Sequence, residues 1–150
     1  MNITLAVIGK LKAGPELSLY SEYLRRLPWK VSLKELDIKK ISGERKSQEA
    51  ELLLAAIADD EYLIALDERG KELTSIELAG HIRKIQDRGI RHIAFCIGGA
   101  DGLHESVLQK ANLTLSFGRV TWPHMLMRVL LAEQLYRAHT ILSGHPYHRE

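Results

Sequence analysis

The sequence predicts a single α/β domain over residues 1–150, built on a mostly parallel sheet of five or six strands with helices on both faces. Short apolar runs rich in β-branched residues alternate with helix-length amphipathic segments along the chain. This alternation is typical of parallel sheets whose crossover connections are helices. A length of 150 residues is ordinary for one domain. No repeat, low-complexity tract or linker interrupts the pattern.

The predicted strands are residues 3–9, 31–38, 61–67, 91–99 and 113–116. The second alternates apolar and polar side chains, which is typical of a half-buried strand. The third and fourth are nearly continuous apolar runs, as expected for strands covered on both faces.

The predicted helices are residues 16–27, 43–60, 74–89, 104–111 and a last one from about 123 to 142. Pro28 ends the first helix, and Thr74 with Glu77 three residues later predicts a capping box for the third. Pro123 is placed to begin the last helix.

The last predicted helix is apolar around most of its circumference, which indicates burial on most sides. In a chain with one sheet, we expect a second subunit to supply part of that cover, giving a homodimer. Arg128 and Arg137 are nine residues apart and therefore project to opposite sides of the helix. One of them is expected to face a partner. Glu133 and Arg137 have the spacing of an ion pair one turn apart.

The composition indicates a reducing compartment, and we expect a cytoplasmic protein. Cys96 is the only cysteine and lies in an apolar run, so no disulfide can form within the chain. No segment approaches the roughly 20 apolar residues that span a bilayer, and the first apolar run has the character of a strand. The net charge of +2 neither requires nor excludes an RNA partner.

Three predicted strand ends carry polar or glycine-rich loops, and ligands of open α/β sheets bind at such ends. The loops are "LDERGK", "IGGADG" and "SFGRVTWPH". None of them matches a P-loop, a dinucleotide fingerprint or a nucleophile elbow. The glycines of "IGGADG" permit either a plain tight turn or close approach of the backbone to a ligand.

The segment "GHPYHRE" at residues 144–150 holds side chains that commonly bind ligands. A zinc site is disfavoured, since Pro146 separates His145 from His148 and neither an HExxH motif nor a cysteine pair accompanies them. We therefore expect no metal.

The motifs "AVIGK", "EYLRRL", "LDERGK", "IGGADGL", "TWPH", "EQLYRA" and "PYHRE" span the whole chain. With them, the chain resembles the ribosomal RNA large subunit methyltransferase H family of the SPOUT methyltransferases. The resemblance implies a C-terminal trefoil knot and a homodimer with active sites near the subunit interface. It also implies methyl transfer from S-adenosylmethionine to N3 of a pseudouridine in 23S ribosomal RNA of the assembled bacterial ribosome.

The resemblance further implies which residues contact the methyl donor: Leu66, Gly98, Phe117, Gly118, Arg119, Val120, Thr121 and Trp122. A carboxylate such as Glu133 would favour the positive sulfonium.

For the target base, the chemistry needs a proton acceptor or a group that stabilises the developing anion. Glu133 and His148 are candidates for the first role, and Arg137 and Arg149 for the second. Tyr147 is a candidate to stack on the base, and Arg149 to hold a phosphate. For His124, a helix cap and a catalytic role both remain open. The competing function is a non-catalytic ribosome-binding module that keeps the fold, and donor binding distinguishes the two.

Overall fold

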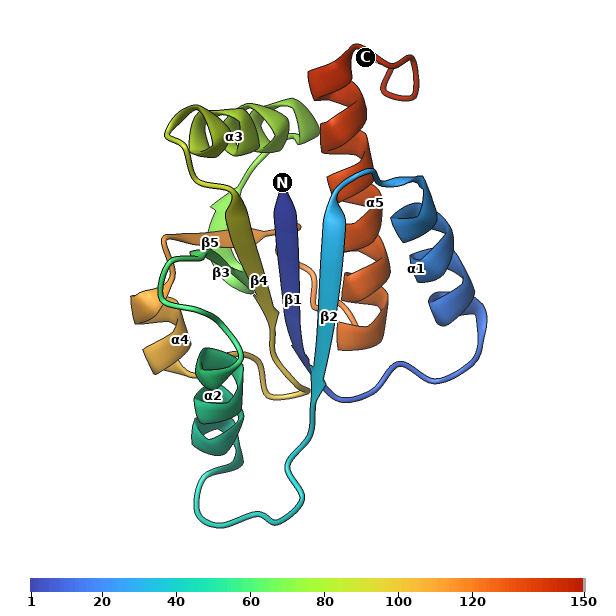
Figure 1. Ribbon diagram of the computed structural model, residues 1–150. Coiled ribbons are helices and arrows are strands. Elements are labelled where there is room, and N and C mark those ends of the chain that lie inside the picture. Colours follow the sequence, from blue (N-terminus) through green and yellow to red (C-terminus); the bar gives the residue numbers. More distant parts are fainter. Residues whose placement is uncertain (150) are drawn as a thin grey trace.

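A computed structural model describes residues 1–149 and contains ten elements in strict alternation of strand and helix (Figure 1). In chain order they are β1 (Asn2–Ile8), α1 (Pro15–Arg26), β2 (Lys30–Leu36), α2 (Arg45–Ala55), β3 (Tyr62–Glu72), α3 (Ser75–Asp87), β4 (His92–Ile97), α4 (Glu105–Lys110), β5 (Leu113–Ser116) and α5 (His124–Ser143). In this part of the chain no helix is long and apolar enough to cross a membrane.

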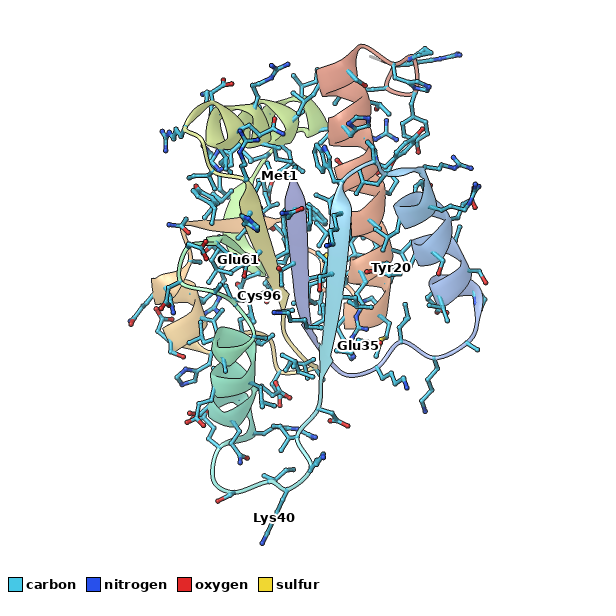
Figure 2. The ribbon with its side chains drawn as sticks, viewed as in Figure 1. Met1, Tyr20, Glu35, Lys40, Glu61 and Cys96 are labelled. Atoms are coloured by element: carbon cyan, nitrogen blue, oxygen red, sulfur yellow. The ribbon has the colours of Figure 1, made fainter. Side chains whose placement is uncertain are left out.

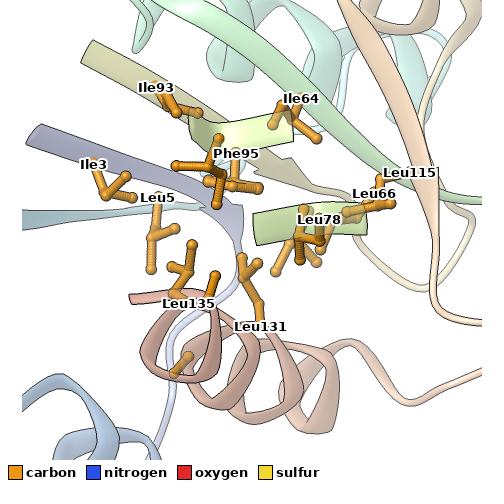
Figure 3. Packing of buried hydrophobic residues seen from close by; sticks show 14 of the residues in the cluster. Ile3, Leu5, Ile64, Leu66, Leu78, Ile93, Phe95, Leu115, Leu131 and Leu135 are labelled. Carbon is orange, nitrogen blue, oxygen red and sulfur yellow. The ribbon is translucent and has the colours of Figure 1, made fainter. Parts of the chain in front are cut away.

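The five strands form one parallel sheet in the order β2-β1-β4-β3-β5. Helices cover both faces, as the sequence predicted. Side chains alternate along each strand between two apolar clusters, so that Leu5 faces one cluster and Ala6 the other. Leu131 and Leu135 of α5 are directed toward the larger cluster, which includes Leu5 and Phe95 (Figure 3).

β3 is longer than the sequence predicted. The apolar pattern ends at Asp67, but the strand continues to Glu72 and pairs there with β5 after a register shift between Leu66 and Lys71. Gly70 makes this pairing possible, because a Cβ atom at that position would lie 2.7 Å from the backbone of Thr114 and Leu115. The polar stretch "DERGK" is therefore strand rather than loop, and its side chains are exposed or half-buried.

α2 is shorter than the predicted helix of residues 43–60. The chain leaves the helix after Ala55, and the carboxylate of Glu61 accepts a hydrogen bond from the backbone amide of Ala58 (2.9 Å). The capping box of α3 is present as predicted, with Thr74 accepting from the backbone of Glu77 and Glu77 accepting from the backbone of Thr74.

α5 packs between α1 and α3 against the sheet, so neighbours within the chain already cover much of its apolar surface. Arg128 points inward and is only 1% exposed. It donates hydrogen bonds to the carbonyl oxygens of Ile8 and Gly9 (2.8 Å each) and pairs with Glu35 (3.2 Å). Arg128 therefore joins α5 to the carboxyl ends of β1 and β2.

Candidate functional site

An open cleft of about 380 Å³ lies at the carboxyl end of β4 and beside the middle of β3, next to the segment between β5 and α5. Its volume is within the usual range for small-molecule sites. The lining residues are Lys46, Leu66, Asp67, Glu68, Arg69, Ile97, Gly98, Gly99, Ala100, Asp101, Gly102, Leu115, Phe117, Gly118, Val120, Thr121, Trp122, His124 and Met127. The cleft therefore combines apolar side chains, glycine backbone and carboxylates, a mixture suited to a ligand with both flat apolar and charged parts.

The loop after β4 forms one wall of the cleft and turns sharply on itself. A Cβ atom at Gly98 would lie 2.7 Å from the carbonyl oxygen of Gly102, and Gly99 and Gly102 form an isolated antiparallel bridge. Gly102 has a φ of 77°, a conformation that favours glycine. The turn itself therefore requires glycine at position 98. This turn holds the backbone of the loop against the cleft.

The segment 117–122 forms the opposite wall and is held in place by side-chain hydrogen bonds. The Ser116 hydroxyl accepts from the Gly118 amide (3.1 Å), and the Trp122 indole donates to the Phe117 carbonyl (3.2 Å). The Thr121 hydroxyl donates to Glu68 on β3 (3.1 Å). Gly118 has a φ of 106°, which a residue with a side chain rarely adopts. The segment is therefore folded on itself and tied to the extended part of β3.

Charge is unevenly distributed in the cleft. Hydrogen bonds from Arg69 hold the pKa of the Asp67 carboxyl below its usual value, so Asp67 is ionised at neutral pH. Burial, followed by the positive charge of Arg128, lowers the pKa of His124, which is therefore neutral. The side chain of His124 does not cap α5, because Pro123 occupies the N-cap position and makes no side-chain hydrogen bond.

Seven of the eight residues expected to contact the donor line this cleft; the exception is Arg119, whose side chain is exposed outside the lining. Sequence reasoning missed several other lining residues. Asp67 and Glu68 belong to "LDERGK" and Asp101 to "IGGADG", two segments that the sequence indicated as candidate ligand-binding loops. Lys46 and Met127 lie in helices and gave no signal in the sequence, because only the tertiary fold brings them to the cleft.

Four of the five predicted catalytic residues gather elsewhere, on the second half of α5 and the following segment. Glu133 accepts hydrogen bonds from Arg137 Nε (2.9 Å), Gln134 (2.7 Å) and the Tyr147 hydroxyl (3.1 Å). Arg137 also contacts His148 Nδ1 (3.2 Å) and lies over the Tyr147 ring, 4.8 Å from its centre. Glu133, Arg137, Tyr147 and His148 are called the tail cluster below.

The tail cluster is half-buried, and its contacts set its charges. Hydrogen bonding to Glu133 raises the pKa of Arg137, which keeps the guanidinium positive. Burial raises the pKa of Tyr147, so its phenol remains protonated at neutral pH. Arg149 is exposed beside the cluster. Within residues 1–149, no three His, Cys, Asp or Glu side chains gather as metal ligands would.

The tail cluster and the cleft belong to opposite ends of α5. The helix begins at the carboxyl edge of the sheet and ends at the amino edge, as the N and C labels of Figure 1 show. His124 and Arg137 are separated along the helix by about 20 Å. A second cavity of about 400 Å³ has lining residues in common with both sites, Phe117, Gly118 and Trp122 from the cleft and Glu133 from the tail cluster.

Comparison with known proteins shows the family of the chain. A family model described as "Predicted SPOUT methyltransferase" matches residues 1–148. Among curated relatives, the ribosomal RNA large subunit methyltransferase H of Paramagnetospirillum magneticum is 51% identical, with 99% of each chain covered. The protein of the same name from Rhodospirillum centenum is 50% identical, again with 99% of each chain covered.

Solved structures share the fold. A probable methylase family protein from Haemophilus influenzae superposes with a TM-score of 0.58 at 14% identity, over 99% of this chain and 70% of that one. A putative methyltransferase from Legionella pneumophila, solved with its cofactor SAM bound, superposes with a TM-score of 0.51 at 14% identity, over 92% and 66%. Together with the match along nearly the whole chain, the fold and the relatives show that this protein belongs to the ribosomal RNA large subunit methyltransferase H family of SPOUT methyltransferases.

Proposed function

We propose that the protein transfers a methyl group from S-adenosylmethionine to N3 of a pseudouridine in 23S ribosomal RNA of the assembled bacterial ribosome, in the cytoplasm. The observation that carries the proposal is the cleft at the carboxyl end of β4 and the middle of β3. Seven residues expected at the donor line it, and they come from three segments far apart in the sequence. The names of the curated relatives support ribosomal RNA as the substrate.

The cleft fits the donor's chemistry. Leu66, Leu115 and Met127 offer apolar surface for a flat adenine ring, and the backbone of residues 98–102 lies open to its polar edge. Asp67 is ionised and lines the same space, so it favours the positive charges of the donor. Within one chain, the carboxylates that line the cleft are Asp67, Glu68 and Asp101 rather than Glu133.

The tail cluster fits the acceptor's chemistry. The donor supplies the methyl group: the N3–carbon bond forms as the carbon–sulfur bond breaks, and the electron pair of that bond remains on sulfur. N3 of the base must lose its proton, and the Arg137 guanidinium is suited to stabilise the resulting negative charge. His148 is the proposed acceptor of the proton: its Nδ1, which accepts from Arg137 (3.2 Å), becomes free to take the proton when the guanidinium turns to the N3 anion. Tyr147 remains protonated and therefore positions the base instead of accepting its proton.

The distance along α5 implies that one chain does not complete the site. We propose a homodimer with a C-terminal trefoil knot, in which the tail cluster of one subunit meets the donor cleft of its partner. Val120 (60% exposed) and Trp122 (37% exposed) lie beside the cleft and offer apolar surface to a second subunit.

Calorimetry with S-adenosylmethionine, followed by methylation of 70S ribosomes with labelled donor, tests the proposal. We expect stoichiometric donor binding, one labelled position in 23S RNA that maps to a pseudouridine, and dimers in sedimentation. A Gly98→Val variant should lose donor binding, because the added side chain would collide with the backbone of Gly102 and displace the loop that forms the cleft wall. A thermal melt of the same preparation shows how much of the fold the variant keeps. Ribosome binding without donor binding would favour a non-catalytic ribosome-binding module, and unchanged donor binding by the Gly98→Val variant would place the donor elsewhere.

A further inference from the structure

Two loops at the carboxyl edge of the sheet concentrate positive charge. The segment 9–14 follows β1 and contains Lys10 and Lys12. The segment 37–46 follows β2 and contains Lys39, Lys40, Arg45 and Lys46. β1 and β2 are paired up to Ile8 and Leu36, so the two loops leave the sheet side by side. These six residues are called the basic rim; Figure 1 shows the two segments leaving β1 and β2 at the same edge of the sheet.

The basic rim reverses the charge balance of the rest of the chain. The two segments hold six of the 21 lysines and arginines but only two of the 19 acidic residues, Asp37 and Glu44. They carry a net charge of +4, which leaves −2 for the remainder. A whole-chain charge of +2 therefore conceals two positive loops.

The positive charges of the rim are available to a partner. Lys10, Lys12, Lys39 and Lys40 are exposed, and none of them makes an ion pair within residues 1–149. Figure 2 shows Lys40 at the tip of its loop, directed away from the protein. Arg45 and Lys46 stand in the first turn of α2, where the helix dipole disfavours positive charge. Arg45 is nevertheless paired with the buried Glu49 (3.5 Å), so the four exposed lysines are the charges left for a partner.

The rim adjoins the proposed donor site, because Lys46 itself lines the cleft. We propose that the basic rim docks on the phosphate backbone of ribosomal RNA and holds the target nucleotide near the cleft. This inference rests on the proposed function and adds the surface that recognises the substrate. Lysines on flexible exposed loops suit phosphate contacts, which fix position on RNA without reading its sequence. The cleft differs from the rim in charge, because the ionised Asp67 lines the cleft.

Two triple variants with the same change in charge test the proposal. Lys12→Gln/Lys39→Gln/Lys40→Gln alters the rim and spares Lys46 in the cleft. Lys30→Gln/Lys84→Gln/Arg88→Gln removes three exposed charges near the amino edge of the sheet. We expect the rim variant to bind ribosomes about tenfold or more weakly at physiological salt, with the slope of log affinity against log salt reduced by about two to three. The control variant should bind like the wild type, and both should keep the wild-type affinity for S-adenosylmethionine.

Equal losses in both variants, or unchanged ribosome binding by the rim variant, would overturn the proposal. A loss of affinity with an unchanged salt slope would mean that the rim contacts a ribosomal protein, and would also overturn it. Methyl transfer by the wild type tests the proposed function separately. The comparison of ribosome binding between the two variants does not depend on that activity.

Discussion

At the residue scale, Glu49 is buried although it carries a carboxyl group. It is 5% exposed, one of its oxygens has no hydrogen-bond partner, and Arg45 approaches the other only to 3.5 Å. It faces Gly99 in the cleft wall, where an added Cβ would meet the carboxylate at 3.0 Å. Burial raises the pKa of Glu49 above its ordinary value of 4.5. The group therefore links the stability of the protein to pH.

Because the folded state holds the Glu49 proton more tightly than the unfolded state, this group stabilises the fold at low pH. That contribution is lost as pH rises through the raised folded pKa. We expect Glu49→Gln to melt at a higher temperature than wild type at pH 7, with a difference that shrinks toward pH 4.5. Thermal melts across this range measure the effect, with the exposed Glu51→Gln on the same helix as control. A variant that is less stable at every pH would contradict the prediction.

Arg128 is the second buried charge, and its hydrogen bonds hold the ends of β1 and β2 to α5. Arg128→Met should destabilise the protein by about 2–4 kcal/mol, since it leaves the carbonyl oxygens of Ile8 and Gly9 without this donor and removes the ionic partner of Glu35. Urea unfolding measures the change. Arg26→Met, which breaks an exposed pair with Glu22, should have little effect. An Arg128 effect as small as that of Arg26 would show that the buried network contributes nothing to stability.

At the scale of elements, the second half of β3 depends on a single glycine. Gly70→Ala should destabilise the protein strongly, because the added Cβ would overlap the backbone of β5 rather than a side chain that could move. Gly80→Ala is the matched control: it lies inside α3 with open space around it, and should be stabilising by about 0.5–1 kcal/mol. Urea denaturation measures the free energy of unfolding of both variants. An equally mild effect of the two substitutions would contradict the close approach of β3 to β5 at Gly70.

The sequence predicted all ten elements, because each has a clear apolar period or a recognisable cap. It missed the length of β3, since "DERGK" is polar and its strand conformation comes from pairing with β5. It predicted that one of the two arginines of α5 faces a partner, but not which one. The burial of Arg128 could not be predicted, because the carbonyl oxygens that it binds lie more than a hundred residues away in the chain. The donor residues were predicted through the resemblance to a family. Lys46 and Met127 were missed because their positions depend on packing.

At the scale of the whole molecule, the tail cluster ties the final segment to α5. Tyr147 packs on Tyr136 with ring centres 4.7 Å apart, and its hydroxyl donates to Glu133. The final segment therefore contributes to stability, since an aromatic pair of this kind is worth about 0.5–1.5 kcal/mol. The segment remains small compared with the core, so its loss is expected to lower the melting temperature without unfolding the protein.

Deleting residues 145–150 should leave donor affinity largely intact and lower methyl transfer by about a hundredfold or more, equivalent to roughly 3 kcal/mol of transition-state stabilisation. The reason is that the donor cleft lies at the other end of α5. Calorimetry, melting and ribosome methylation should be measured on one preparation. Full methylation by the truncated protein would show that residues 145–150 are not part of the catalytic site.

The central claim is that a donor cleft and a tail cluster from two subunits form each active site. Its most direct test mixes Gly98→Val chains, which lack a working cleft, with chains lacking residues 145–150. Each variant alone should be inactive on ribosomes. After denaturation and joint refolding, random pairing should restore about a quarter of the wild-type activity, because half the dimers are mixed and each contains one complete site. Subunit exchange is verified with differently tagged chains, and mixed dimers that remain inactive would contradict the account.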